Sequence, residues 1–327
     1  MTYGIFIGRF QPAHTGHLHA LSVAASQVGT LLILIGSANR ARSIRNPWTY
    51  SERVMGIRAG LRARGVENVQ FAPLNDYKYN DDQWITDVRT TVEKLTKGKV
   101  IFFGHTKDGN NYLNWFPEWK YCEINSEIIL NATQVRQKMF DTQDRAMPAT
   151  VLDDYNYYEG EKQRFANYPF PETLNFNCAD AVVVCQGKVL LIKRKHAPGR
   201  DCWALPGGFK NRNETFLDCA MRELVEETNI RVPLAVLYGS IKGTQLFDDP
   251  NRNYGIPRNT LAVYVVVKPD PDGKPPRANG CDDASETKWV DIMDALNNYP
   301  LFDDHSDIIS KMTGTQALPA IFSNMAN

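Results

Sequence analysis

Two histidines lie three residues apart near the N-terminus, in a segment that could bind phosphate. Residues 8–17 read GRFQPAHTGH and contain His14, His17 and the neighbouring Arg9. An apolar run of strand length precedes this segment and an amphipathic stretch follows it, so both imidazoles should lie at a helix start, where backbone N–H groups also attract anions. Gly8 allows the backbone to approach a ligand closely. A bare pair of histidines could equally be solvated loop residues, but the strand–loop–helix context and Arg9 favour phosphate binding.

Three glutamates in the second half of the chain have the spacing of one helix face. Glu223, Glu226 and Glu227 stand at positions i, i+3 and i+4. Crowded carboxylates are unfavourable unless a cation joins them, and their oxygens suit Mg²⁺ or Mn²⁺. Arg222 would orient a glutamate rather than contact a substrate. The alternative is a charged, solvated helix face; the whole pattern of residues 208–230, with LPGGF at 205–209 in front of it, favours the metal site.

The elements that must position the histidines alternate between strand and helix. Apolar runs at 3–7, 31–35, 69–72 and 99–103 have strand length, and amphipathic stretches lie near 17–28, 51–64 and 83–95. A short strand near 121–124 and a helix at 133–140 follow. This rhythm predicts an α/β domain of Rossmann type, a parallel sheet covered by helices with ligands at the carboxyl ends of its strands.

The second half has a different pattern. Residues 153–175 are polar, aromatic and interrupted by proline, which indicates a linker that packs against a domain. Beyond it we expect strands at 179–185, 188–192, 236–240 and 261–267 and a helix at 216–227, a mixed α+β domain. The predicted organisation is a nucleotide-binding domain at 1–152, the linker at 153–175 and a second domain at 176–327.

Composition excludes several classes of protein. The 327 residues carry 37 Lys and Arg against 37 Asp and Glu, so nothing suggests a nucleic-acid or membrane-surface partner. No apolar run approaches the roughly 20 residues needed to span a bilayer, and the N-terminus does not resemble a signal peptide. The six cysteines form no CxxC pair. We therefore expect reduced thiols in a cytoplasmic protein; a homo-oligomer is possible.

Residues 8–17 resemble the HxGH signature of the nucleotidyltransferase superfamily, in its nicotinamide-nucleotide adenylyltransferase version. Segments at 46–53 (NPWT, then Glu52 and Arg53), 76–84, 104–117 and 131–136 (NATQVR) resemble further motifs of that family in the same order. Trp48 replaces the usual Phe. The resemblance covers roughly residues 3–145. It implies transfer of AMP from ATP to NMN, in which the NMN phosphate attacks the α-phosphorus and pyrophosphate leaves.

The same resemblance assigns roles around the phosphates. His14 and His17 would bind the ATP phosphates, which Mg²⁺ would bridge. Arg9 and Arg136 would neutralise charge, and Thr133 would offer its hydroxyl and a helix-start N–H.

The nicotinamide end would be bound by two further residues. Trp84 would stack on the ring and Asn80 would bond the carboxamide, although Trp84 could instead be a core aromatic. Lys107 could be either a ligand or a solvated loop lysine. The remaining positions expected to bind ATP or NMN are Gly8, Phe10, Asn46, Gly104, Lys107 and Asp108.

Residues 208–230 resemble the Nudix box, GX5EX7REUXEEXGU. Glu223, Glu226 and Glu227 would be its metal ligands. Asn229 stands where the box has Gly; because that residue ends the helix, where Asn is the next best tolerated, the fold should survive with a small loss of stability. The resemblance implies Mg²⁺-dependent hydrolysis of a nucleoside diphosphate linked to another moiety. Glu227 and Glu286 are candidates for the general base, and Glu286 could also be a surface residue.

Segments at 249–252 and 258–260 resemble part of the pattern of ADP-ribose pyrophosphatases, so Arg252 and Arg258 would bind ADP-ribose. A segment at 302–305 resembles another element of that group, though His305 alone reads as a helix-start histidine.

Together the resemblances imply a bifunctional enzyme that makes NAD from NMN and ATP and cleaves ADP-ribose to AMP and ribose 5-phosphate. Cleaving NAD would undo the first reaction, which favours ADP-ribose. Alternatives are a Nudix half that senses ADP-ribose or NAD without turnover, or cleaves another nucleoside diphosphate derivative, and a first domain that uses a different phosphate or acid substrate.

Overall fold

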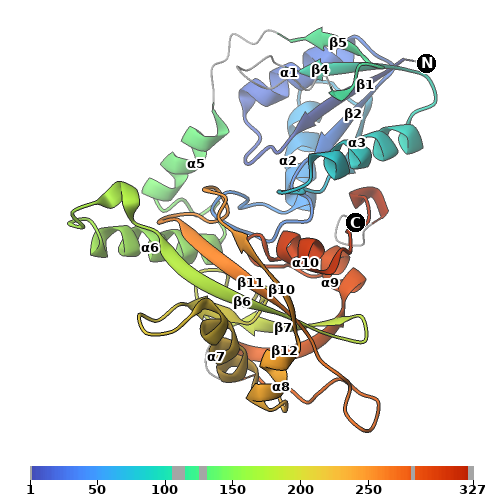
Figure 1. Cartoon of the computed structure of the whole chain (residues 1–327). Coiled ribbons are helices and arrows are strands. Elements are labelled where there is room, and N and C mark those ends of the chain that lie inside the picture. The colour runs from blue at the N-terminus through green and yellow to red at the C-terminus, as the bar shows by residue number, and fades with distance from the viewer. Residues whose placement is uncertain (1, 105–114, 125–130, 281–283, 323–327) are drawn as a thin grey trace. The chain divides into compact units, whose positions relative to one another are not determined.

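The computed structural model describes residues 2–104, 115–124, 131–280 and 284–322, and the chain divides into two compact units (Figure 1). Unit 1 consists of Met1–Arg40, Asn46–Pro148 and Leu318–Asn327. Unit 2 consists of Ala41–Arg45 and Ala149–Ala317. In the described residues, no helix has the length and apolar character that a bilayer crossing requires.

Unit 1 contains a five-stranded parallel sheet. Its strands are β1 (Thr2–Gly8), β2 (Thr30–Ile35), β3 (Val69–Pro73), β4 (Lys99–Gly104) and β5 (Lys120–Glu123), in the order β3-β2-β1-β4-β5. The predicted Rossmann-like sheet is therefore confirmed. Strand order reverses beside β1, and ligands of open α/β sheets bind at the carboxyl ends of the strands at such a point. Gly8 and Gly104 end the two adjacent strands there.

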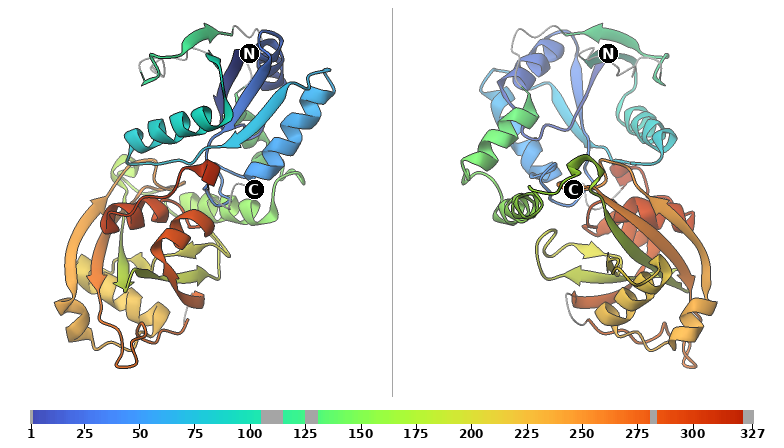
Figure 2. Two further views of the ribbon diagram at one scale, coloured as in Figure 1. Left: turned by 90° about the vertical axis from the view of Figure 1, so that its right-hand side faces the viewer. Right: turned by 60° about the vertical axis from the view of Figure 1, so that its left-hand side comes forward.

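Helices cover both faces of this sheet (Figures 1 and 2). Helices α1 (Thr15–Ser26) and α2 (Tyr50–Arg62) bury Leu21 and Ile57 against one face, together with Ile33 of β2. Helix α3 (Asp81–Leu95) buries Val88 against the other face, beside Leu34. This alternation of β2 side chains explains its unbroken apolar sequence, which is typical of a strand buried on both faces. Helix α5 spans Ala132–Asp141.

Unit 2 is built on a mixed sheet, as predicted. The main strands are β6 (Phe176–Cys185), β7 (Lys188–Arg194), β10 (Ile241–Phe247), β11 (Arg258–Val266) and β12 (Ala284–Asp291), in the order β10-β11-β6-β7-β12. Strands β11 and β6 are parallel, whereas the β10–β11, β6–β7 and β7–β12 pairs are antiparallel. Short strands β8 (Trp203–Ala204) and β9 (Gly207–Phe209) pair with β7 and β6.

Helix α7 (Phe216–Thr228) packs on this sheet (Figure 1). Its residues Cys219 and Leu224 share a core with Val183 of β6 and Val263 of β11. The other helices of unit 2 are α6 (Ala149–Arg164), α8 (Leu234–Gly239), α9 (Ile292–Asn298) and α10 (His305–Thr313). Two 3-10 turns complete the described elements, η1 (Pro171–Thr173) and η2 (Ala320–Phe322).

Three expectations differ from the structure. The segment 153–175, expected as a linker, lies in unit 2, and helix α6 occupies its first part. Its apolar periodicity is weak because the buried side chains of α6 include the polar Asp154 and Glu161. The expected strand at 236–240 is wrong: α8 occupies that segment, directly after Pro233. Residues 318–322, expected in the second domain, belong to unit 1.

Candidate active sites

The loop after β1 folds back on itself. Phe10 has a φ of +51°, and its buried ring covers Gly8, where an added Cβ would lie 2.8 Å from that ring. Glycine is therefore required at position 8 for steric reasons. The Phe10 ring also meets the His17 ring edge-on, with centroids 5.0 Å apart. Phe10, expected to contact the nucleotide, instead lies in the core beneath His17.

His14 and His17 form a reciprocal cap at the start of α1. His14 is the N-cap: its Nδ1 accepts from the His17 backbone N–H at 3.3 Å, and His17 Nδ1 accepts from the His14 N–H at 3.4 Å. The two rings stack with centroids 3.7 Å apart. Because both Nδ1 atoms are acceptors, the neutral form of each ring carries its proton on Nε2. An Nε2–H group is the donor that a phosphate oxygen needs.

Gln11 connects the histidine loop to the segment before α2. The side chain is buried; its Nε2 donates to the Trp48 carbonyl at 2.9 Å and its Oε1 accepts from the Trp48 N–H at 3.0 Å. Arg136 of α5 donates through Nη1 to the Gln11 carbonyl and through Nη2 to Thr133 Oγ1, at 3.3 Å for the latter. The structure thus brings Arg136 and Thr133 to the loop that carries the histidines.

Arg53 fixes the same loop to the end of β2. Its buried guanidinium donates to the carbonyls of Arg9 at 2.7 Å and Gly36 at 2.6 Å, and to that of Ser37 at 3.3 Å. Burial lowers the pKa of Arg53 to about 10, which leaves it charged at neutral pH. The residue Arg9 is exposed, so its side chain is accessible from solvent.

Asn80 and Trp84, the residues expected at the nicotinamide ring, both lie on α3. Asn80 is the N-cap, and its Oδ1 accepts from the Gln83 N–H at 3.1 Å. Trp84 is half-buried and packs edge-on against Trp115, with centroids 5.7 Å apart, and near Phe116 at 6.1 Å. Part of the Trp84 ring therefore packs against other aromatic rings, which is what its interpretation as a core aromatic predicts.

Asp87 is a fully buried carboxylate on α3 that sequence reasoning missed. It accepts from the backbone N–H of Asn75 and of Ala320, each at 3.1 Å, and from Tyr77 Oη at 3.4 Å and Thr91 Oγ1 at 3.5 Å. Burial raises its pKa to about 6, against the opposing effect of these hydrogen bonds. Through these hydrogen bonds, Asp87 of α3 connects Asn75 and Tyr77 with Ala320 near the C-terminus.

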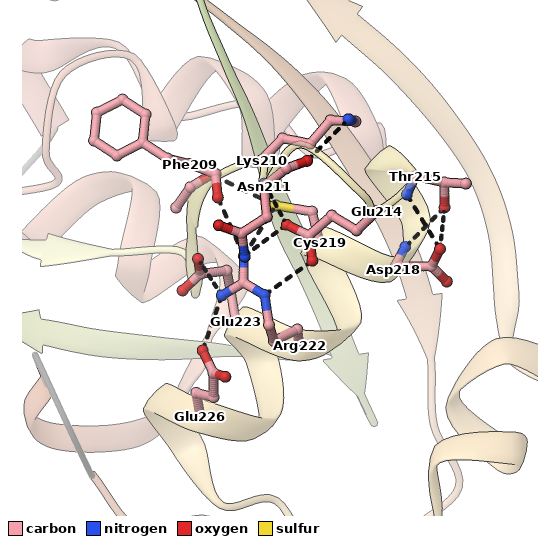
Figure 3. A network of polar contacts seen from close by, with 11 residues as sticks. Phe209, Lys210, Asn211, Glu214, Thr215, Asp218, Cys219, Arg222, Glu223 and Glu226 are labelled. Atoms are coloured by element: carbon pink, nitrogen blue, oxygen red, sulfur yellow. Dashed lines mark hydrogen bonds and ion pairs between the residues drawn. The ribbon is translucent and has the colours of Figure 1, made fainter.

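In unit 2, Arg222 lies at the centre of an ionic network (Figure 3). It makes a two-point contact with Glu214, at 3.0 and 2.8 Å, and its Nη1 contacts Glu223 at 2.7 Å and Glu226 at 2.9 Å. The Arg222 hydrogen bonds lower the pKa of Glu214 to about 2. Arg222 also donates to the Phe209 carbonyl at 3.1 Å, which holds β9 against the helix.

The carboxylates on this face of α7 are crowded and partly buried. Glu227 is buried, and its Oε2 accepts from the Gly207 N–H at 3.0 Å. Burial raises the pKa of Glu227 to about 8, with Glu223 adding to the effect, and burial also raises the pKa of Glu223. An added Cβ at Gly208 would lie 2.5 Å from a Glu223 oxygen, so only glycine leaves this space.

This donor set has the chemistry of a divalent-cation site, since hard cations prefer carboxylate oxygens and offset their repulsion. Among the residues with described positions, no group of three His, Cys, Asp or Glu side chains is arranged to hold a metal. Arg222 contacts oxygens of Glu223 and Glu226 that a cation would have to take over. The residue types therefore fit a divalent cation, but the Glu223 and Glu226 carboxylates would have to leave Arg222 in order to bind it.

Asn229 ends α7 in the left-handed conformation, at φ 42° and ψ 41°. Its N–H donates to the Val225 carbonyl at 2.8 Å. Asn229 therefore ends the helix in a conformation typical of glycine, as expected, and the small loss of stability stays a prediction.

Arg252 and Arg258, expected to bind ADP-ribose, have different environments. Arg252 is buried and makes a two-point ion pair with the buried Asp304, at 2.9 and 3.1 Å, so it stabilises the start of α10. Arg258 contacts Glu161 of α6 at 2.6 Å. His305 begins α10 and its Nδ1 accepts from the Leu205 N–H at 2.9 Å; burial lowers its pKa.

Comparison with known proteins identifies the family of each half of the chain. The cytidylyltransferase-like family matches residues 5–106, and the NUDIX domain family matches residues 176–312.

A nicotinamide/nicotinic acid mononucleotide adenylyltransferase of Acinetobacter baylyi is 35% identical over 143 residues, which are 42% of this chain and 76% of that protein. The crystal structure of a bifunctional NMN adenylyltransferase/ADP ribose pyrophosphatase from Francisella tularensis superimposes with a TM-score of 0.83 at 30% identity. It covers 95% of this chain and 98% of its own. The chain belongs to this bifunctional family. A second structure of the Francisella tularensis protein, with AMP and a Mn ion, matches with the same TM-score at 29% identity.

For this member of the bifunctional family, some predicted site residues stay untested. Lys107 and Asp108 lie outside the described residues. Asn46 and Gly104 are half-buried, and Gly104 ends β4. Glu286 is exposed on β12.

The residues that sequence reasoning missed are Gln11, Arg53 and Asp87, which hold the loops of unit 1 in place. Gln11 lies in the motif at 8–17 and Arg53 in the motif at 46–53, so their positions in the sequence could have indicated a role for them. For Asp87, a lone acid on the apolar face of a predicted helix was the available signal.

Proposed function

We propose that unit 1 makes NAD and pyrophosphate from NMN and ATP, and that unit 2 hydrolyses ADP-ribose to AMP and ribose 5-phosphate. The observation that carries this proposal is the presence in one family member of both the capped histidine pair and the crowded glutamate helix. The five described cysteines are free thiols, which fits a cytoplasmic enzyme.

Adenylyl transfer needs no protein nucleophile, so unit 1 acts by positioning and charge neutralisation. The Nε2–H groups of His14 and His17, beside the N-terminus of α1, would donate to ATP phosphate oxygens. Arg136 lies next to the same loop and would balance negative charge that develops on pyrophosphate. The exposed Arg9 would supply a further positive charge.

The nicotinamide end of NMN would meet α3. Asn80 uses Oδ1 to cap the helix, so its Nδ2 group would donate to the carboxamide oxygen. Trp84 would offer the remaining part of its ring for stacking. Gln11 and Arg53 would act indirectly, because they fix the histidine loop and the end of β2.

In unit 2, Glu223, Glu226 and Glu227 would hold a divalent cation, which we propose to be Mg²⁺. When bound, such an ion supplies positive charge to the diphosphate and its leaving group. Arg222 holds Glu214 and keeps the glutamate side chains on one face of α7. The Gly207 N–H orients the Glu227 carboxylate, and Glu227 is our candidate for the residue that takes the proton from the attacking water.

The test is a pair of assays on the wild type and two variants. Purified protein with Mg²⁺ should form NAD from ATP and NMN, and AMP from ADP-ribose. His17→Ala should lose the first reaction and keep the second, and Glu227→Gln should do the reverse. A His17→Ala protein with near-normal NAD synthesis would remove the assignment of unit 1; loss of both reactions in either variant would show that the two sites are not independent.

A further inference from the structure

Helix α6 belongs to unit 2 and places acidic and aromatic side chains in its interior. Asp154 accepts from the Gly199 N–H at 2.9 Å, and Tyr158 packs beneath Gly255, where an added Cβ would lie 2.6 Å from the ring. One turn further on, Glu161 is 2% exposed. A carboxylate is almost never buried to this degree unless it is paired.

The partner of Glu161 is Arg258, the first residue of β11. Glu161 Oε1 accepts from Arg258 Nη2 at 2.6 Å. Glu161 Oε2 is buried and has no hydrogen-bond partner among the described residues. A one-sided buried pair of this kind is a poor source of stability, because part of the desolvation cost is left uncompensated. It therefore calls for an explanation other than folding.

The Arg258 guanidinium lies among three aromatic rings. Its guanidinium carbon lies 5.2 Å from the ring centroid of Tyr158 and 5.5 Å from those of Phe176 and Phe209. Its Nη1 donates to the Ile256 carbonyl at 3.1 Å. With the Glu161 contact, two of the five N–H donors of arginine have partners in the described structure. The other three donors have no partner among the described residues, and the Arg258 side chain is 11% exposed.

This cluster adjoins the Nudix box. Phe209 directly follows Gly208, is 47% exposed, and its carbonyl accepts from Arg222. Arg258 thus lies between α6 and the strand that leads into the glutamate helix.

We infer that Glu161 is a positioning residue for the hydrolase: it holds the Arg258 guanidinium in the orientation that contacts the nucleoside diphosphate substrate. An arginine side chain loses considerable rotamer entropy when it is fixed, so holding it in place in advance lowers the cost of binding. The inference rests on the proposed hydrolysis of ADP-ribose. It means that the segment 153–175, which was expected to be a linker, contributes to substrate binding by unit 2.

Steady-state kinetics of ADP-ribose hydrolysis test the inference. Glu161→Gln keeps the size of the side chain and removes its charge; it should raise KM about tenfold and leave kcat within about twofold. The dissociation constant of AMP, measured by calorimetry, should rise with KM. The matched control is Glu159→Gln, a half-exposed residue of the same helix that pairs with Lys162 at 2.7 Å; both parameters should stay at wild-type values.

A double-mutant cycle separates positioning from a merely structural role. Arg258→Lys should raise KM as well, and Glu161→Gln should add nothing to KM in the Arg258→Lys background, because Glu161 acts through Arg258. Multiplicative effects on KM would overturn the inference, as would a KM of Glu161→Gln within about twofold of wild type.

If part of the variant protein were unfolded, the maximum rate would fall but KM would not change, since KM is independent of the concentration of active enzyme. A raised KM is therefore not explained by partial unfolding. If Glu161→Gln gives no folded protein, Glu161→Asp, which keeps the charge but is one methylene shorter, should show the same rise in KM; an unchanged KM would overturn the inference. Wild-type protein that does not hydrolyse ADP-ribose contradicts the proposed function itself. Wild-type hydrolysis with an unchanged variant KM contradicts only the role of Glu161.

Discussion

The Nδ1 atoms of His14 and His17 each accept the other residue's backbone N–H, at 3.3 and 3.4 Å. One pair of side chains therefore caps helix α1 and sets its own tautomer. The capping function and the phosphate-binding function use different nitrogen atoms, so substitutions can separate them.

His14→Asn and His14→Ala test this separation. Asn is among the best N-cap residues and can accept from the His17 N–H, whereas Ala cannot, so only His14→Ala should lose about 1 kcal/mol of stability. Both variants lack the Nε2–H donor, and both should lose NAD synthesis by at least about 100-fold. Thermal unfolding and NAD formation measure the two effects. Normal NAD synthesis in His14→Asn would show that the cap alone is needed.

Gln11 should be important for the stability of unit 1. Gln11→Ala leaves the Trp48 N–H and carbonyl without their side-chain partner, at a cost of about 3 kcal/mol. The exposed Gln70 is the control, since Gln70→Ala should change stability by less than about 0.5 kcal/mol. Urea unfolding of both variants provides the comparison. Equal stabilities would mean that the two hydrogen bonds to Trp48 contribute nothing.

Much of the fold follows from the sequence, because runs rich in Leu, Ile and Val such as 31–35 and 179–185 are typical of buried strands. Helix α7 and the glutamate spacing follow from periodicity. Helix α6 does not, since its buried side chains include the polar Asp154 and Glu161, and Glu161 pairs with Arg258, 97 residues away. The short apolar segment at α8 has no periodicity that separates a strand from a helix.

The sites were predictable as sets of residues but not as contacts. The histidine and glutamate motifs indicate their chemistry by type and spacing. The sequence could not show that Phe10 packs under His17, because that contact depends on how the loop after β1 folds. It could not show that Arg252 pairs with Asp304, because these residues are 52 positions apart.

Glu227→Gln should weaken divalent-cation binding as well as hydrolysis. The amide keeps the size of the side chain but cannot ionise to give the carboxylate that a divalent cation prefers, so the dissociation constant of Mn²⁺ should rise at least about tenfold. Electron paramagnetic resonance of free Mn²⁺ measures this without turnover. Unchanged Mn²⁺ binding would remove Glu227 from the cation site.

Asp87 should make stability depend on pH. Its pKa is raised to about 6 in the folded protein, against about 3.9 when unfolded, so the folded state retains a proton that the unfolded state has lost. This contribution is fully present below about pH 3.9 and is lost as pH rises through about 6.

Asp87→Asn removes this titration. The stability of wild type minus that of Asp87→Asn should therefore fall by about 2 kcal/mol between pH 4 and pH 7. Urea unfolding at the two pH values gives the difference. A difference that is constant, or that grows with pH, would contradict the raised pKa.

Asn229→Gly should stabilise unit 2 slightly. The residue has a φ of 42°, where glycine has no Cβ penalty, so a gain of about 0.5 kcal/mol is expected; Asn229→Val should lose about 1 to 2 kcal/mol. Hydrolysis of ADP-ribose should be unchanged by the glycine. Thermal unfolding distinguishes the variants, and destabilisation by glycine would show that the Asn side chain is itself required.

The most direct test of the account is to incubate wild-type protein with Mg²⁺ and either ADP-ribose or NAD, and to quantify AMP by chromatography. The account predicts AMP from ADP-ribose and little from NAD, so that the hydrolase does not consume the product of the first unit. AMP from neither substrate, or from NAD in preference to ADP-ribose, would contradict it.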